Sequence, residues 1–182
     1  MLIPYIHVPD FEIGPLPVIH KSIPLHPFGL LVATGVIVGA WLATWRARRR
    51  GIDEQHLNSF ITWILVFGFM GGHMLDEIFY HPAELMRRPE SLFFLWEGLS
   101  SFGGFTGAVI GGVLWKYFYA VPMLDTPLFT LFKFRRRKVA APLLPFADLI
   151  MSVFPVAWIF GRGGCSVVHD HKGALVDSPL SV

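Results

Sequence analysis

The stretch "PFGLLVATGVIVGAWLATW", Pro27 to Trp45, decides the fold, because it is apolar throughout and contains no charged residue. A helix of about 20 such residues is long enough to cross the hydrocarbon core of a bilayer. The whole chain has the same character: 53% of its 182 residues are hydrophobic and 15% are charged. These shares lie above and below those of an ordinary soluble domain, so the sequence predicts a membrane protein.

Three more apolar segments follow, and lipid offers no hydrogen-bond partner for an open sheet edge, so each is expected to be helical. The sequence therefore predicts an all-α, polytopic helical membrane protein that forms a single membrane domain over residues 1–182. Its four transmembrane helices are expected near residues 25–45, 58–76, 98–120 and 140–161.

The basic residues indicate the orientation of these spans. They cluster at residues 46–50 and 133–138, which fall on one side of the membrane if the spans alternate. The positive-inside rule makes that side the cytoplasm. The lead-in 1–24, with the N-terminus, and the tail 162–182 are then extracytoplasmic. Because the clusters adjoin spans and the net charge is only +2, they favour contact with membrane lipids over nucleic acid.

Small and polar residues mark the third and fourth spans. Gly107 and Gly111 have the spacing that lets helices approach closely. Gly103 and Gly104, beside Ser101, leave backbone donors accessible to a phosphate. Asp148 is expected inside the fourth span, as a buried helix–helix acceptor or a functional acid.

Arg162 lies beyond the fourth span among Gly161, Gly163 and Gly164. Its guanidinium can offer two parallel hydrogen bonds to a phosphate, and the glycines leave room for one. A snorkelling arginine at a span end is the alternative. The single cysteine, Cys165, is interpreted as a small apolar side chain.

Histidines and carboxylates gather in two places. His73, Glu77 and Tyr80 have the spacing of one helical face, and His169, Asp170 and His171 follow the fourth span. Together they resemble a His and carboxylate metal site, but without a recognised ligand spacing, so no metal or cofactor is predicted.

Four segments resemble the bacterial phosphatidylglycerol-prolipoprotein diacylglyceryl transferases, in order and over almost the whole chain. They are "LHPFG", "GGHMLDEIFYHP", "WEGLSSFGGFTG" and "GRGGCSVVHDHKG". The chain departs from the family pattern at six positions. It has Phe28 where the family has a tyrosine, His73 in place of an arginine, Phe102 in place of a histidine, Cys165 and Val168 in place of asparagines, and Asp170 in place of a glutamate.

The resemblance implies a multi-pass enzyme of the bacterial plasma membrane. It would move a diacylglyceryl group from phosphatidylglycerol to the lipobox cysteine thiol of a prolipoprotein signal peptide. Arg162 and Asp170 are then catalytic, with Arg162 as the phosphate anchor. Because Phe102 cannot accept a proton, His73, His26 or the histidines beside Asp170 are the candidate bases. The implied substrate-binding residues are Phe28, Gly29, Ser101, Phe102, Gly103, Gly104, Gly161, Gly164 and Gly173.

Two other functions remain open at this point. One is a catalytically silent, lipid-binding relative, and the other is an intramembrane metal-dependent hydrolase that uses His73, Glu77, His169 and His171. Because chains of the family continue through further spans, the resemblance implies a truncated copy, a fragment or a diverged relative.

Overall fold

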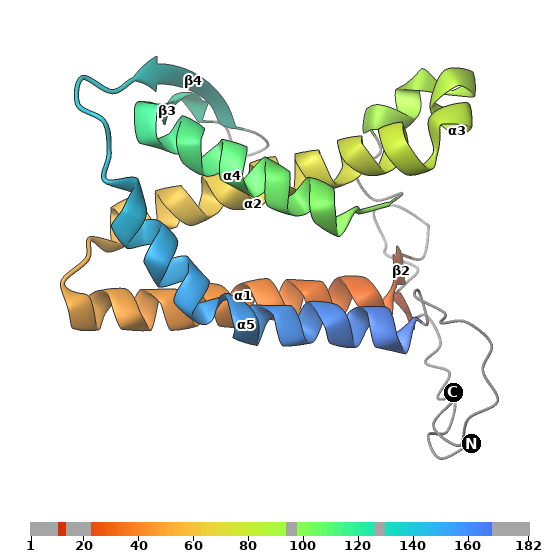
Figure 1. The fold of residues 1–182 in the computed structure, drawn as a ribbon, viewed down its shortest axis with the longest axis horizontal. Coiled ribbons are helices and arrows are strands. Elements are labelled where there is room, and N and C mark those ends of the chain that lie inside the picture. The colour runs from red at the N-terminus through yellow and green to blue at the C-terminus, as the bar shows by residue number, and fades with distance from the viewer. Residues whose placement is uncertain (1–10, 14–22, 94–97, 126–129, 169–182) are drawn as a thin grey trace, which may run out of the picture. The chain divides into compact units, whose positions relative to one another are not determined.

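The computed structural model describes residues 11–13, 23–93, 98–125 and 130–168 (Figure 1). Contacts divide the chain into two compact units, one formed by the residues up to Arg46 and from Ile150 onward, the other by Ala47–Leu149. The single membrane domain expected from the sequence stays a prediction. The elements, in chain order, are β1 (Phe11–Ile13), β2 (Ile23–Leu25), α1 (Pro27–Arg50), α2 (Glu54–Tyr80), α3 (Pro82–Arg87), the 3₁₀ helix η1 (Pro89–Phe93), α4 (Ser101–Tyr117), β3 (Phe118–Asp125), β4 (Thr130–Arg136) and α5 (Leu143–Val167).

The predicted all-α membrane fold is confirmed by three helices that are long and apolar enough to cross a membrane. They are α1, α2 and α5, with mean hydropathies of 1.8, 1.3 and 1.9. Helix α4 has 17 residues. At 1.5 Å per residue it is about 26 Å long, a little less than the ~30 Å hydrocarbon core. The count of four spans and the extracytoplasmic N-terminus therefore stay predictions.

The prediction that residues 98–120 form one helix was wrong at its end. The helix stops at Tyr117, and Phe118 begins β3, which pairs antiparallel with β4. Phe118, Tyr119 and Val121 are aromatic or β-branched, and such residues favour strands. The second strand satisfies the backbone of the first, so hydropathy alone does not reveal this change. Strands β1 and β2 form a second antiparallel pair.

Helices α2 and α4 cross antiparallel with their backbones in contact (Figure 1). A Cβ added at Gly71 would lie 2.6 Å from the carbonyl oxygen of Gly103, and one at Gly107 would overlap the carbonyl oxygen of Phe67. A Cβ at Gly111 would lie 2.7 Å from the carbonyl oxygen of Trp63. The predicted packing role of Gly107 and Gly111 is confirmed, because only glycine permits this approach.

An aromatic cluster joins α2, α4 and α5 in the same unit. Trp115 is fully buried, and its ring lies 4.9 Å from that of Phe60 and 5.0 Å from that of Phe146, measured between centroids. The indole N–H of Trp115 donates to the Ser59 hydroxyl at 3.2 Å, so its one polar atom is satisfied. The start of α5 is thereby packed against α2 and α4.

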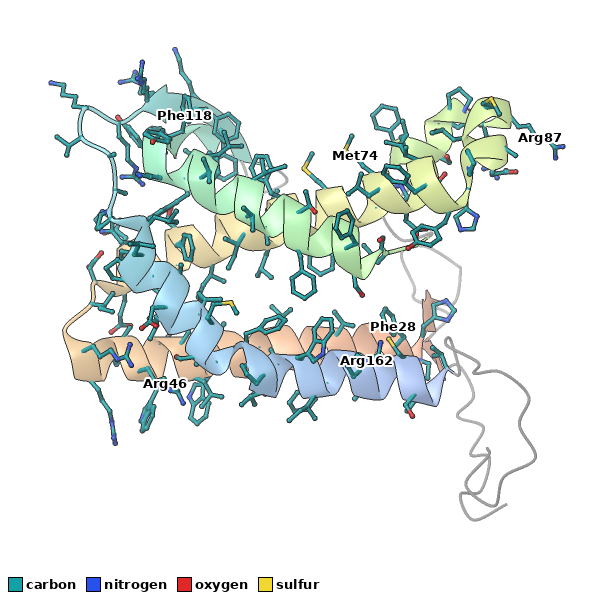
Figure 2. The ribbon with its side chains drawn as sticks, viewed as in Figure 1. Phe28, Arg46, Met74, Arg87, Phe118 and Arg162 are labelled. Carbon is teal, nitrogen blue, oxygen red and sulfur yellow. The ribbon has the colours of Figure 1, made fainter. Side chains whose placement is uncertain are left out.

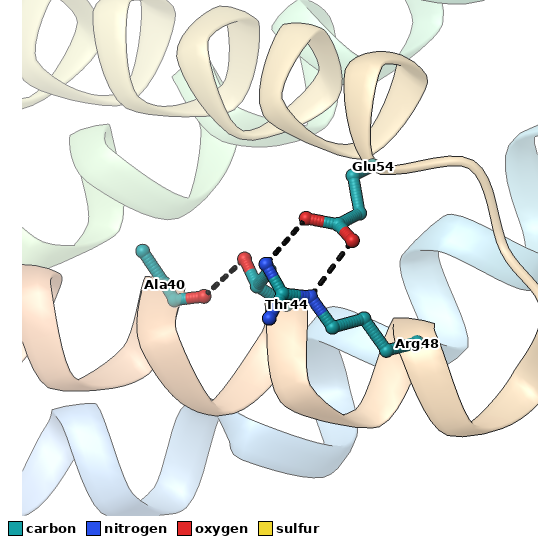
Figure 3. Close-up of polar contacts among 4 residues, drawn as sticks. All are labelled: Ala40, Thr44, Arg48 and Glu54. Atoms are coloured by element: carbon teal, nitrogen blue, oxygen red, sulfur yellow. Dashed lines mark hydrogen bonds and ion pairs between the residues drawn. The ribbon is translucent and has the colours of Figure 1, made fainter.

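Ion pairs join the end of α1 to its neighbours in this unit. Arg48 makes a two-pronged contact with Glu54, at 2.7 and 3.0 Å, as Figure 3 shows, and the neighbouring Thr44 hydroxyl donates to the Ala40 carbonyl. Gly51 turns the chain with a φ of 65°. Asp53 then caps α2 by accepting the backbone N–H of His56 at 2.8 Å, and this hydrogen bond lowers the pKa of its carboxyl.

Asp148 lies inside α5, one of the candidate spans, as predicted, but the expectation that it is buried was wrong. Its side chain is 75% exposed and accepts a hydrogen bond from Arg50 at 3.2 Å. Because α5 begins at Leu143, Asp148 lies in its second turn, where a basic partner from α1 is available.

In the other unit, α1 and α5 pack antiparallel. A Cβ at Gly35 would lie 2.8 Å from the Ala157 carbonyl oxygen. Arg46 donates to the Ser152 carbonyl at 2.8 Å, in the turn before Pro155. Pro155 lacks the N–H that would bond to the carbonyl of Met151, and Arg46 binds the next carbonyl along this turn.

Candidate functional site

The end of α5 carries the arginine that the sequence singled out. Gly161 to Gly164 are helical, and the helix continues to Val167, beyond the span end at residue 161 expected from the sequence. Arg162 is exposed, and within the described part of the chain it makes no hydrogen bond or ion pair. A guanidinium in this state has all its donors available for an anionic ligand.

The glycines around Arg162 differ in their surroundings. A Cβ at Gly161 or Gly163 would meet no atom within 4 Å, so both leave open space beside the arginine. Gly164 is buried, and a Cβ there would lie 2.9 Å from Cδ2 of Phe28. Figure 2 shows Phe28 on α1 and Arg162 on α5 at the same end of the helix pair. The Gly164 contact therefore positions the last turns of α5 against α1.

The start of α4 holds the second group of predicted residues. Ser101 and Phe102 are exposed, and Phe102 is 70% exposed. Gly103 is buried, and its N–H is 3.4 Å from the Ser100 hydroxyl, which caps the helix. The Gly104 N–H donates to the Ser100 carbonyl at 2.9 Å. The two backbone donors expected to face a phosphate are thus already hydrogen bonded, and their role in substrate binding stays a prediction.

His73 and Glu77 lie on one face of α2, as predicted, and both are buried. The His73 ring lies between two backbone carbonyls, with Nε2 at 2.9 Å from that of Ser91 and Nδ1 at 3.3 Å from that of Gly98. The Ser91 hydroxyl donates to the Glu77 carboxylate at 2.7 Å. This buried cluster fastens the segment before α4 to α2. As a candidate base, His73 would need to leave both carbonyl contacts.

The remaining predicted residues fall into separate groups. His26, exposed at the start of α1, belongs to the same compact unit as Arg162, Phe28 and Gly29. Tyr80 is 68% exposed and does not join the His73 cluster. Asp170, Gly173, His169 and His171 lie outside the described residues. Over the described ranges, no three His, Cys, Asp or Glu side chains gather as metal ligands.

The sequence reasoning missed two contributors. Ser91 has no motif that marks it, and its role depends on how η1 folds back on α2. Arg46 was read only as part of a basic cluster, although it follows an apolar span directly, a position from which a long side chain can reach a neighbouring helix.

The apolar helices define an α-helical membrane protein, and the end of α5 carries an exposed arginine. Residues 17–182 match the family model of prolipoprotein diacylglyceryl transferase, and the chain belongs to this family. It is similar to proteins named phosphatidylglycerol–prolipoprotein diacylglyceryl transferase from Francisella tularensis, at 26% identity for subspecies holarctica strain FTNF002-00 / FTA and 27% for subspecies mediasiatica strain FSC147. Each alignment covers 98% of this chain and 58% of the relative, so the chain spans somewhat more than half the length of these relatives.

Proposed function

We propose that this chain transfers a diacylglyceryl group from phosphatidylglycerol to the cysteine thiol of a prolipoprotein signal peptide, as a multi-pass protein of the bacterial inner membrane. Its family and the names of its relatives support this reaction. A thioether bond forms between the cysteine sulfur and a glycerol carbon. The bond from that carbon to the phosphate oxygen breaks, and glycerol phosphate leaves with the negative charge.

The main structural support for this proposal is the exposure of Arg162. This residue is exposed at the end of α5, flanked by two open glycines, and it has no partner among the residues described. A guanidinium binds phosphate with two hydrogen bonds and stabilises the charge that develops on the leaving group. Gly164 and Phe28 hold this helix end in place, which gives both residues a positioning role.

The cysteine thiol of the prolipoprotein substrate needs a base to take its proton, since the ordinary pKa of a thiol is about 8.5. Among the described histidines, His26 is exposed and belongs to the unit that contains Arg162, whereas His73 is fully buried between two carbonyls. We therefore propose His26 as the base ahead of His73. The histidines that flank Asp170 are the alternative, with Asp170 orienting one of them.

The test is a transfer assay with phosphatidylglycerol nanodiscs and a lipobox peptide, in which mass spectrometry detects the thioether product. Arg162→Ala is expected to abolish product, and Arg162→Lys to retain part of the activity, because lysine keeps the charge but not the paired donors. Arg87→Ala is the matched control, since Arg87 is exposed at the end of α3. Full activity of Arg162→Ala would refute the proposed anchor. Phosphatidylglycerol binding without turnover by the native chain would instead identify a lipid-binding relative.

A further inference from the structure

An apolar cavity of about 230 Å³, open to the surface, lies on the unit formed by Ala47–Leu149. It is lined by Trp63 and Phe67 of α2, Leu114 of α4, Phe118 of β3 and Phe134 of β4. Trp63 and Phe67 are stacked at 5.6 Å between ring centroids, and Phe134 meets Trp63 edge-on at 5.5 Å. The surface that these side chains present to the cavity is apolar, so the cavity suits a hydrocarbon chain.

The β3–β4 register places one cation beside this cavity. Phe118 pairs with Arg136, and Ala120 pairs with Phe134. Directly opposed residues share a face of the hairpin, and so do alternate residues of one strand. Arg136 therefore lies on the same face as Phe118 and Phe134, the two hairpin residues that line the cavity.

Arg136 is available for a ligand, and its neighbour is not. Arg137 donates to the carbonyls of Trp115 and Phe118 and lies 5.3 Å above the Trp115 ring, so it ties the hairpin to the end of α4. Arg136 is exposed and has no hydrogen bond or ion pair with any residue that the structure describes. Three further exposed cations are near in sequence and have no such partners: Lys133, Arg135 and Lys138. Lys133 and Arg135 lie on the other face of the hairpin, where they pair with Val121 and Tyr119.

We propose that the cavity and Arg136 form a binding site for one anionic phospholipid, distinct in its residues from the Arg162 site. Part of an acyl chain lies against the five lining side chains, and Arg136 binds the headgroup phosphate. Lys133, Arg135 and Lys138 give this region a positive potential, which favours a lipid with net negative charge over a zwitterionic one. The positive charge of this region matches the lipid phosphate, and the apolar cavity matches its acyl chain, so an anionic phospholipid fits both.

The experiment uses Trp63 as a reporter, because it lines the cavity and is 7% exposed. Acyl-brominated phosphatidylglycerol or phosphatidylcholine is titrated into the detergent-solubilised full chain, and the Trp63 signal is taken as the difference between the native chain and Trp63→Phe. Brominated phosphatidylglycerol is expected to quench this signal at a concentration about fivefold or more below that of phosphatidylcholine.

Three variants sharpen this measurement. Arg136→Gln is expected to remove most of the preference for phosphatidylglycerol, whereas the matched control Arg87→Gln is expected to keep it. Leu114→Trp fills the cavity and is expected to abolish quenching by both lipids, with helix content checked by circular dichroism. Equal quenching by the two lipids, or an unchanged preference in Arg136→Gln, would overturn the proposal. Displacement of the brominated lipid by soluble glycerol phosphate at equal concentration would also overturn it, because the cavity would then contribute nothing.

Discussion

Gly107→Ala provides a direct test of the α2–α4 crossing. The added methyl group would overlap the Phe67 carbonyl oxygen and would lie 3.1 Å from the Cα of Gly71. Both neighbours are backbone atoms, which cannot rotate away, so the helices must separate. Over-packing of this kind costs about 1–3 kcal/mol, and we expect the upper end here. Alanine has a better helix propensity than glycine and stabilises the helix by about 1 kcal/mol, so the expected net decrease in the free energy of unfolding is about 2 kcal/mol.

Gly104→Ala is the matched control on the same helix. A Cβ there has only one neighbour, the Gly68 carbonyl oxygen at 3.9 Å, which is an ordinary contact. This variant is expected to be unchanged or up to about 1 kcal/mol more stable. Reversible unfolding in mixed micelles, followed by tryptophan fluorescence, measures both free energies of unfolding. If Gly107→Ala proves as stable as Gly104→Ala, the backbone-contact interpretation of this crossing is refuted.

Three further predictions concern polar contacts. Ser91→Ala removes a donor to the buried Glu77 carboxylate and is expected to cost about 1–3 kcal/mol in the same unfolding assay; no loss would show that this carboxylate has another donor. Arg46→Met keeps the aliphatic stem but loses the bond to the α5 carbonyl, and is expected to cost about 1 kcal/mol, whereas Arg46→Lys should lose less. Asp53→Ala should lower the melting temperature near pH 6 by removing the α2 cap, while Asp53→Asn keeps it. The His56 N–H lowers the pKa of Asp53, so the extra stability of the ionised carboxylate over the neutral Asp53→Asn cap is complete above the unfolded pKa of about 3.9 and is lost as the pH falls through the folded pKa; an advantage of the native chain over Asp53→Asn that grows as the pH falls contradicts this.

Hydropathy and glycine spacing predicted much of this fold because they report on local physics. An uncharged run such as that in α1 has no stable state in lipid other than a helix, and the Gly107 and Gly111 spacing can be read within one helix. The strand that begins at Phe118 was not predictable in this way, because its pairing partner Arg136 lies in a separate, basic segment. The exposure of Asp148 was not predictable either, because it depends on how Arg50 of α1 approaches the start of α5.

In the candidate site, too, local features were predictable from the sequence and long-range contacts were not. The open space beside Arg162 follows from local sequence, since its two chain neighbours, Gly161 and Gly163, have no side chain. The contact of Gly164 with Phe28 joins residues at opposite ends of the chain, so no local pattern announces it. The two carbonyl contacts of His73 likewise arise from a loop that returns to α2.

The division of contacts into two units has a consequence for the order of assembly. The unit formed by Ala47–Leu149 is continuous in sequence, and its helices α2 and α4 are joined by residues 81–100, which include α3 and η1. The α1–α5 pair is different, because the Arg46 bond to Ser152 joins residues 106 positions apart. During synthesis α2 and α4 can pack while α5 is still inside the ribosome, and most of α1 stays in the lipid without its partner until α5 emerges. The helix end that carries Arg162 is therefore among the last parts of the described chain to reach its place, so mutations that weaken α1–α5 packing should prolong the exposure of α1 to membrane quality control.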